Sequence, residues 1–173
     1  MRINGIGGGS TITGLNFEKE TDILTLLQST VGYSVKDSVI YYENKEVARS
    51  MKKNALYIYL ASRGVDYKTI LSKKLLPDEA IYVIINNTLF VIEVKFQQVA
   101  GSVDEKLQTC DFKRKQYAKL MAPLNIEVEY IYILSDWFRN PVYKDVLDYI
   151  ISVGCQYYFK YLPLQKLGLP IPN

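Results

Sequence analysis

Three ionisable side chains at the ends of two apolar runs are spaced so that they could act together. The stretch LPDEAIYVIINNTLFVIEVK has Asp78 near its start and Glu93 and Lys95 at its end. Two carboxylates that converge with room for water are the oxygen ligands that Mg²⁺ prefers. A lysine beside them can orient an attacking water or stabilise charge on a phosphate. These residues therefore predict metal-assisted hydrolysis of a phosphodiester, in which the ion polarises the phosphoryl oxygen and generates the nucleophile.

A β-hairpin would bring the three side chains together. Asparagine tolerates the positive φ that tight turns need, so Asn86 and Asn87 predict a two-residue turn. In that register Asp78 lies opposite Lys95 and diagonal to Glu93 on one face, within the roughly 7–8 Å over which diagonal neighbours interact. Both faces of the hairpin are apolar, which predicts a central strand pair covered on both sides. A structural ion pair between Asp78 and Lys95, without a metal, explains the same pattern equally well.

The composition narrows the classes of mechanism. The chain has 173 residues and a net charge of +3, and it contains no histidine. Ser-His-Asp, Cys-His and His-metal mechanisms are therefore excluded, and hydrolysis must use carboxylates, lysine, tyrosine or a metal held by oxygen ligands. Basic residues cluster at 52–53, 73–74 and 113–115. Each cluster fits an ordinary solvated face as well as a surface for a polyanion.

The length and the cysteines indicate the organisation and the compartment. We expect a single domain over residues 1–173, with the Gly- and Ser-rich residues 1–13 as a flexible arm. Cys110 and Cys155 fit no metal-ligand spacing and indicate reduced thiols in an intracellular protein. No apolar run reaches membrane-spanning length, so we expect a cytoplasmic protein with no membrane partner.

Hydrophobic periodicity and capping residues predict the elements that must position these side chains. Before the central hairpin they predict a helix over 15–29, a hairpin over 33–47, a helix over 47–64 and a short helix over 67–75. After it they predict a helix over 101–124 that begins at Ser102, a strand over 126–137, a helix over 140–154 and a strand over 155–162. This order predicts the α/β class, with a mixed central β-sheet flanked by helices on both faces.

The chemical motif resembles a known signature. Pro77-Asp78, fourteen intervening residues and Glu93-Val94-Lys95 are similar to the motif of the PD-(D/E)XK nuclease superfamily. The blocks TGLNFEKETD and FQQVAGSVDEKLQTCDFKRKQY resemble those of small type II restriction endonucleases, and the resemblance covers roughly residues 13–168. It implies a restriction-endonuclease-like core and an enzyme of a restriction-modification system. Such an enzyme cleaves double-stranded DNA at a short specific site with Mg²⁺, as a homodimer, because symmetric sites favour a two-fold protein.

The resemblance assigns roles to individual residues. Asp78 and Glu93 match the metal-binding acids, the Val94 carbonyl is a further expected ligand, and Lys95 matches the catalytic lysine. Glu18 matches an acid that some members supply from the first helix, although an acid near a helix start also suits the helix dipole. Gln97 or Gln98 resembles the polar residue often found near the site. Contacts with DNA are implied for the polar and basic residues after the active strand, which are Gln98, Ser102, Lys106, Lys113, Arg114 and Lys115.

Two other functions fit the same residues. One is a different DNA nuclease on this fold, with a repair, junction-resolving or homing role. The other is a DNA-binding module that has a nuclease-like fold and no catalytic activity. The intact acids Asp78 and Glu93 and the intact Lys95 favour catalysis over the second alternative.

Overall fold

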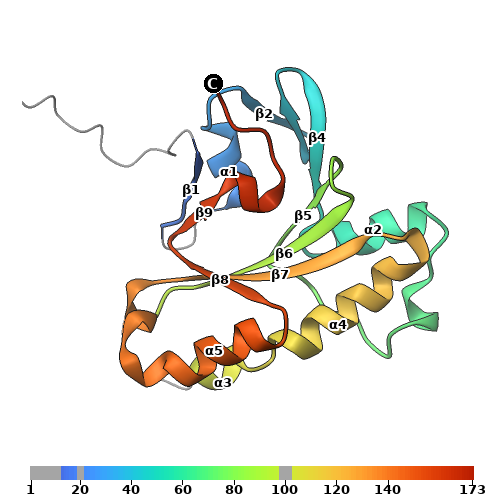
Figure 1. Ribbon diagram of the computed structural model, residues 1–173. Coiled ribbons are helices and arrows are strands. Elements are labelled where there is room, and N and C mark those ends of the chain that lie inside the picture. The colour runs from blue at the N-terminus through green and yellow to red at the C-terminus, as the bar shows by residue number, and fades with distance from the viewer. Residues whose placement is uncertain (1–12, 19–21, 98–102) are drawn as a thin grey trace, which may run out of the picture.

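The protein is a mixed α/β structure built on a seven-stranded sheet (Figure 1). The computed structural model describes residues 13–18, 22–97 and 103–173. Strands β2 to β6 pair antiparallel in chain order, and β6-β7 and β7-β8 are parallel pairs. The strands are β2 (Tyr33–Lys36), β3 (Val39–Tyr42), β4 (Lys45–Ser50), β5 (Glu79–Val83), β6 (Thr88–Lys95), β7 (Glu127–Leu134) and β8 (Gln156–Phe159). The predicted mixed sheet of the α/β class is confirmed.

Different elements cover the two faces of the sheet (Figure 1). One face carries α2 (Ala55–Ser62), α3 (Val103–Leu107), α4 (Cys110–Met121) and α5 (Lys144–Ser152). The other carries α1 (Ile23–Gln28), the two-stranded sheet of β1 (Gly14–Asn16) with β9 (Tyr161–Pro163), and the 3₁₀ turn η5 (Leu164–Leu167). Four further 3₁₀ turns described are η1 (Tyr67–Thr69), η2 (Ala122–Leu124), η3 (Asp136–Arg139) and η4 (Pro141–Tyr143).

The β5-β6 hairpin lies in the middle of the sheet and is covered on both sides, as its apolar faces predict. Leu89 and Val91 pack in the core beneath α2 and α4, whereas Ile81 and Ile92 pack in the core beneath α1 and β9. Side chains alternate between the faces of a strand, so each strand contributes to both cores. Groups at the open end of this hairpin therefore lie at the edge of buried, low-dielectric surroundings.

The predicted turn of this hairpin is wrong, and the error changes which residues face each other. Val83 pairs with Thr88, so four residues rather than two form the connection. Asn87 has a φ of 51° and its N–H bonds to the Ile84 carbonyl at 3.2 Å, which closes the turn. The observed register shifts by two residues relative to the prediction. Because a shift of two preserves the side-chain faces, only the facing partners change.

Several predicted boundaries also need correction. The helix over 15–29 is wrong in its first half, since residues 14–16 form β1 and the helix begins only after Asp22, whose side chain accepts from the Leu24 N–H at 2.8 Å. Residues 33–47 form most of a three-stranded meander rather than one hairpin, and residues 47–50 belong to its last strand, not to a helix.

The short helix predicted over 67–75 is only the turn η1. The long helix over 101–124 breaks between α3 and α4, and the last strand breaks at Lys160, whose φ is 57°.

Candidate active site

Glu93 is the centre of a cluster of cations and hydroxyls at the end of β6. The strand lies between β5 and β7, and the residue is only 8 % exposed. Its carboxylate lies 2.7 Å from the Lys95 ammonium and 3.2 Å from that of Lys113 on α4, and it accepts a hydrogen bond from the Tyr130 hydroxyl on β7. Burial raises the pKa of Glu93, but the hydrogen bonds and charges of Lys95, Tyr130 and Lys113 outweigh it and lower the pKa overall.

Asp78 lies directly before β5 and lines the same small cavity as Glu93. The next step outward from the Glu79–Ile92 pair places Asp78 opposite position 93, and not opposite Lys95 as the sequence predicted. The cavity has a volume of about 80 Å³. A volume of this size can hold an ion with water, because one water needs only about 10–15 Å³ of it. Asp78 and Glu93 therefore line the same cavity.

The structural ion pair between Asp78 and Lys95 is not formed. Asp78 pairs instead with Lys53, and both of these side chains are more than half exposed. Lys53 is held in place by its backbone, since its N–H bonds to the Pro77 carbonyl at 2.8 Å and its φ is 54°. Asp78 therefore forms an ion pair with Lys53, and Lys95 forms one with Glu93.

The donor set suits a hard cation that keeps part of its water shell. Among the residues that the structure describes, no three His, Cys, Asp or Glu side chains gather as a metal site. Mg²⁺ nevertheless commonly binds through one or two carboxylates and several waters. The Lys95 carbonyl accepts from the Ser135 N–H at 3.1 Å on the β7 side, so strand alternation directs the Val94 carbonyl to the edge where Asp78 lies. Two carboxylates, one carbonyl and water fit the chemistry of Mg²⁺.

Tyrosines form the inner wall of the site. Tyr130 and Tyr132 lie on β7 with ring centroids 5.5 Å apart, and Tyr117 on α4 lines the cavity with Tyr130. Burial, together with the charge of Glu93, raises the pKa of all three hydroxyls above the ordinary value for tyrosine. They therefore keep their protons near neutral pH. The Tyr130 hydroxyl acts on Glu93 as a hydrogen-bond donor only.

Glu18 and the glutamines are placed less directly at the site. Glu18 is exposed and lies in the segment between β1 and α1, not in a helix, so its expected position in the first helix is wrong. Gln97 follows β6, and its carbonyl accepts from the Ser135 hydroxyl at 3.0 Å, which fixes the backbone just beyond Lys95. Gln98 and Ser102 lie outside the described residues.

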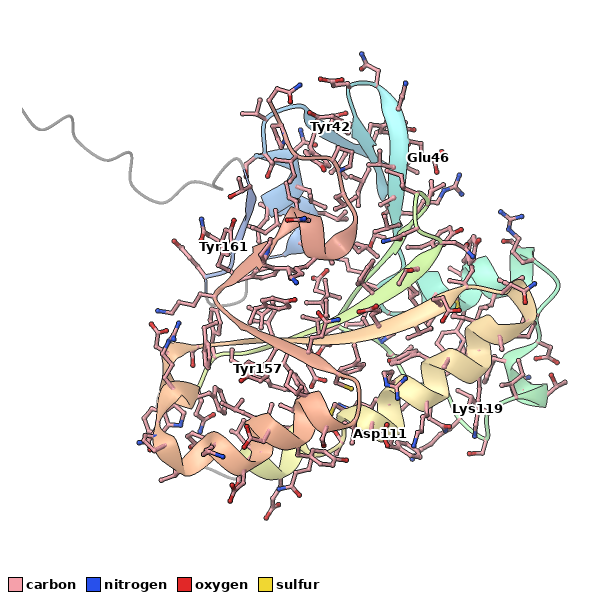
Figure 2. The ribbon with its side chains drawn as sticks, in the orientation of Figure 1. Tyr42, Glu46, Asp111, Lys119, Tyr157 and Tyr161 are labelled. Carbon is pink, nitrogen blue, oxygen red and sulfur yellow. The ribbon has the colours of Figure 1, made fainter. Side chains whose placement is uncertain are left out.

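The basic residues of the following helices have unequal surroundings. Lys106 on α3 is exposed, whereas Lys113 turns inward to Glu93. Arg114 lies 3.3 Å and Lys115 2.9 Å from the carboxylate of Asp111, which Figure 2 shows on the first part of α4. The predicted contacts of these residues with DNA stay predictions, and the charges of the last two are partly neutralised within their own helix.

Three residues of the site were not assigned these partners from the sequence, and two of them, Lys53 and Lys113, had no clear signal for this role. Lys53 and Lys113 come from elements far along the chain from Asp78 and Glu93, and their lysine clusters resemble solvated faces. Tyr130 could have been found, because Val91 pairs with Tyr130 and both face the helices on the same side as Glu93. The signal for Tyr130 was the alternation of tyrosines along a buried strand that lies next to the strand carrying Glu93.

Comparison with known proteins identifies no relative of this chain. No family model matches it, and no curated protein or solved structure matches it either. None of the helices in the described ranges is long and apolar enough to cross a membrane. Function must therefore be inferred from the geometry of the site.

Proposed function

We propose that this chain is a Mg²⁺-dependent endonuclease that hydrolyses double-stranded DNA at a short specific site, as type II restriction endonucleases do. The observation that carries the proposal is the convergence of Asp78 and Glu93 on one small cavity, with the Lys95 ammonium 2.7 Å from the Glu93 carboxylate. The resemblance of the same residues to the PD-(D/E)XK motif supports DNA as the substrate. The proposal includes a restriction-endonuclease-like core and a cytoplasmic location.

The proposed mechanism gives each residue one task. Asp78, Glu93 and the Val94 carbonyl would hold Mg²⁺, which when bound polarises the phosphoryl oxygen and makes a bound water more acidic. Lys95 contacts the Glu93 carboxylate, so its ammonium can orient the attacking water or offset charge on the phosphate. As water adds to phosphorus it releases a proton to solvent, the bond to one ester oxygen breaks, and that oxygen takes up a proton from solvent. Tyr130 fixes the orientation of Glu93 throughout.

The lysines around Glu93 also explain how the site is stable before a metal binds. A buried carboxylate is costly unless a cation neutralises it, and Lys95 and Lys113 supply that charge. Their side chains are 25 % and 31 % exposed, so each can turn toward solvent or toward a phosphate when Mg²⁺ takes over the neutralisation. We further propose a homodimer, because one active site cuts one strand and two are needed to cut both.

Digestion of a mapped plasmid tests the proposal. The protein is incubated with Mg²⁺ or with EDTA, and the ends of the products are mapped. We expect cuts at fixed positions sharing one short sequence, only with Mg²⁺, and nearly none with the variant Lys95→Ala. Lys166→Ala, on the far face of the sheet, is the matched control and should cut normally.

The other outcomes separate the alternative functions. Mg²⁺-dependent cuts without a shared short sequence would favour a repair, junction-resolving or homing nuclease. Binding of the plasmid without any cleavage would establish a non-catalytic DNA-binding module. Normal cleavage by Lys95→Ala would remove the lysine from the mechanism.

A further inference from the structure

The positive charge of the chain is concentrated in one segment beside the candidate site. Residues 52–74 contain six Lys and Arg residues and a single acid, Asp66, in a chain whose net charge is only +3. The remainder of the chain is therefore slightly acidic in sum. Lys68, Lys73 and Lys74 are all exposed. Lys52 and Lys53 are ion-paired with Asp22 and Asp78, so Lys68, Lys73 and Lys74 are the lysines of this segment that would attract a polyanion.

Residues of the same segment line a groove. A hollow of about 620 Å³ opens between α2 and the segment around η1, and its floor includes Tyr57, Tyr67 and the exposed Ile58. The Lys74 ammonium lies 4.9 Å from the ring centroid of Tyr57 and 5.1 Å from that of Tyr67. Such cation–π contacts hold the ammonium over the groove. Lys74 and the acid Asp66 both line the hollow, and Lys68 and Lys73 are exposed next to lining residues in the chain. We call this surface, formed by the hollow between α2 and η1 with Lys74 and the neighbouring Lys68 and Lys73, the α2–η1 groove.

The chain segments that line the α2–η1 groove adjoin those that line the candidate active site. Asn54 lines the groove, and the residue before it, Lys53, pairs with Asp78. The Tyr57 hydroxyl donates to the Leu75 carbonyl at 2.7 Å and accepts from the Leu75 N–H at 2.8 Å, which ties the floor of the groove to the next segment. The residues from Leu75 to Asp78 then line the metal cavity. Figure 1 shows this segment looping out beside α2 and returning to β5.

We propose that the α2–η1 groove binds the phosphate backbone of the DNA next to the bond that is hydrolysed. This inference rests on the proposed function, because it takes DNA as the substrate. Charge favours this surface over α4, where Arg114 and Lys115 are paired with Asp111. The cations of the groove instead lie over aromatic rings or in solvent-exposed positions, and they follow the chain that leads directly to Asp78. A strand seated here has its phosphates on the lysines and its sugar faces against Ile58 and the tyrosine rings.

Binding measured without cleavage tests the inference. Fluorescence anisotropy follows a labelled 30-base-pair duplex in EDTA over a range of salt concentrations. The test variant replaces Lys68, Lys73 and Lys74 by glutamine. The matched control replaces Lys36, Lys45 and Lys166 by glutamine, the same charge change at exposed positions. Lys45 adjoins Glu46, which Figure 2 shows in the upper part of the molecule, whereas Lys119 of α4 lies in the lower part. Thermal unfolding followed by circular dichroism verifies that both variants fold.

We expect the test variant to bind the duplex at least about tenfold more weakly and its salt slope to fall by about 2–3, roughly one unit per lost phosphate contact. The control should change affinity less than about threefold. Equal losses in the two variants, or no binding of the duplex by the wild-type protein, would overturn the inference. Equally tight binding of a labelled polyglutamate peptide, lost in the same variant, would reassign the groove to acidic proteins.

The outcome can be separated from the fate of the nuclease proposal, because binding in EDTA does not require catalysis. Loss of binding in the test variant with no cleavage by the wild-type protein would retain the groove and reject the nuclease. Cleavage by the wild-type protein with unchanged binding in the test variant would retain the nuclease and reject the groove.

Discussion

Two glutamates at the open end of the central hairpin have opposite electrostatic surroundings. Glu93 faces the helices on one side of the sheet, and Glu79 faces α1 on the other. Glu93 has two lysines and a tyrosine hydroxyl as partners, and its pKa is lowered. The Oε2 atom of Glu79 is buried and finds no hydrogen-bond donor among the described residues. Burial and the nearby charge of Asp22 raise the pKa of Glu79 to about 7, although Lys52 opposes them.

The difference shows that burial alone does not decide whether a carboxylate is ionised. Donors reach Glu93 from β7 and α4, whereas the nearest cation to Glu79, Lys52, is bound to Asp22 at 3.2 Å. A buried acid without donors is protonated more easily, and one with three donors is held as an anion. Glu93 is therefore held as an anion on one face, whereas Glu79 on the other face takes up a proton more easily.

The largest expected effect is on cleavage. Glu93→Gln removes one metal-binding charge, and a metal supplies several kcal/mol of transition-state stabilisation, so Mg²⁺-dependent cleavage should fall about a thousandfold or more. Glu79→Gln should cleave within about tenfold of the wild-type rate, since Glu79 faces away from the cavity. Rates of plasmid cleavage at fixed Mg²⁺ concentration measure both. Equal losses in the two variants would remove the distinction between the faces.

Glu93→Gln should also destabilise the metal-free protein. Breaking a buried ion pair costs roughly 3–5 kcal/mol, and the partial exposure of Lys95 and Lys113 reduces this to about 2–3 kcal/mol at pH 7. Because the pKa of Glu93 is lowered by folding, this contribution is present above the unfolded pKa near 4.5 and is lost as the pH falls further. Urea unfolding in EDTA measures the change. An unchanged or increased stability would show that repulsion between Glu93 and Asp78 dominates.

Glu79 should have the opposite pH dependence. Its pKa rises from 4.5 to about 7 on folding, so the folded state holds the proton more tightly and loses stability as the pH rises between these values. Glu79→Gln removes this loss and should be more stable than the wild-type protein by about 2–3 kcal/mol at pH 8, with little difference at pH 4.5. Urea unfolding at the two pH values tests this. A variant less stable at pH 8 would mean that ionised Glu79 has a favourable partner.

The smallest effect is expected for the exposed partner of Asp78. Lys53→Gln breaks an ion pair whose side chains are 55 % and 63 % exposed, and such pairs contribute at most about 1 kcal/mol. Lys52→Gln is the neighbouring control, because it removes the cation that faces Glu79. Its cost should rise from pH 4.5 to pH 8 by more than that of Lys53→Gln, because Lys52 lowers the pKa of Glu79 more than Lys53 does. Thermal unfolding at both pH values compares the two variants.

Much of the local structure follows from the sequence, and the contacts between distant segments do not. The alternation in β6 and β7 predicts which side chains face which core, and Asn140 before Pro141 predicts the start of the segment leading into α5, where its side chain accepts from the Val142 N–H at 3.1 Å. The register of the hairpin was missed because the loop length depends on the conformation of one residue, Asn87.

The partners of the acids were missed for a different reason. Lys53 and Lys113 reach Asp78 and Glu93 only because β4, α2 and α4 pack around the hairpin, and nothing local marks them. The strand β1 was predicted as helix because its three residues gain their conformation from β9. Tertiary pairing of this kind overrides local propensity.

The pairing of β1 with β9 can form only after almost the whole chain has been synthesised. The hydroxyls of Thr13 and Tyr161 lie 2.7 Å apart although 148 residues separate them along the chain. During synthesis, β1 leaves the ribosome long before its partner exists. Buried Leu162, Leu164 and Leu167 arrive equally late to cover this face of the sheet. The apolar side chains of β5, β6 and β7 on this face therefore stay partly uncovered until the last residues are made, and exposed apolar surface of this kind favours aggregation during synthesis.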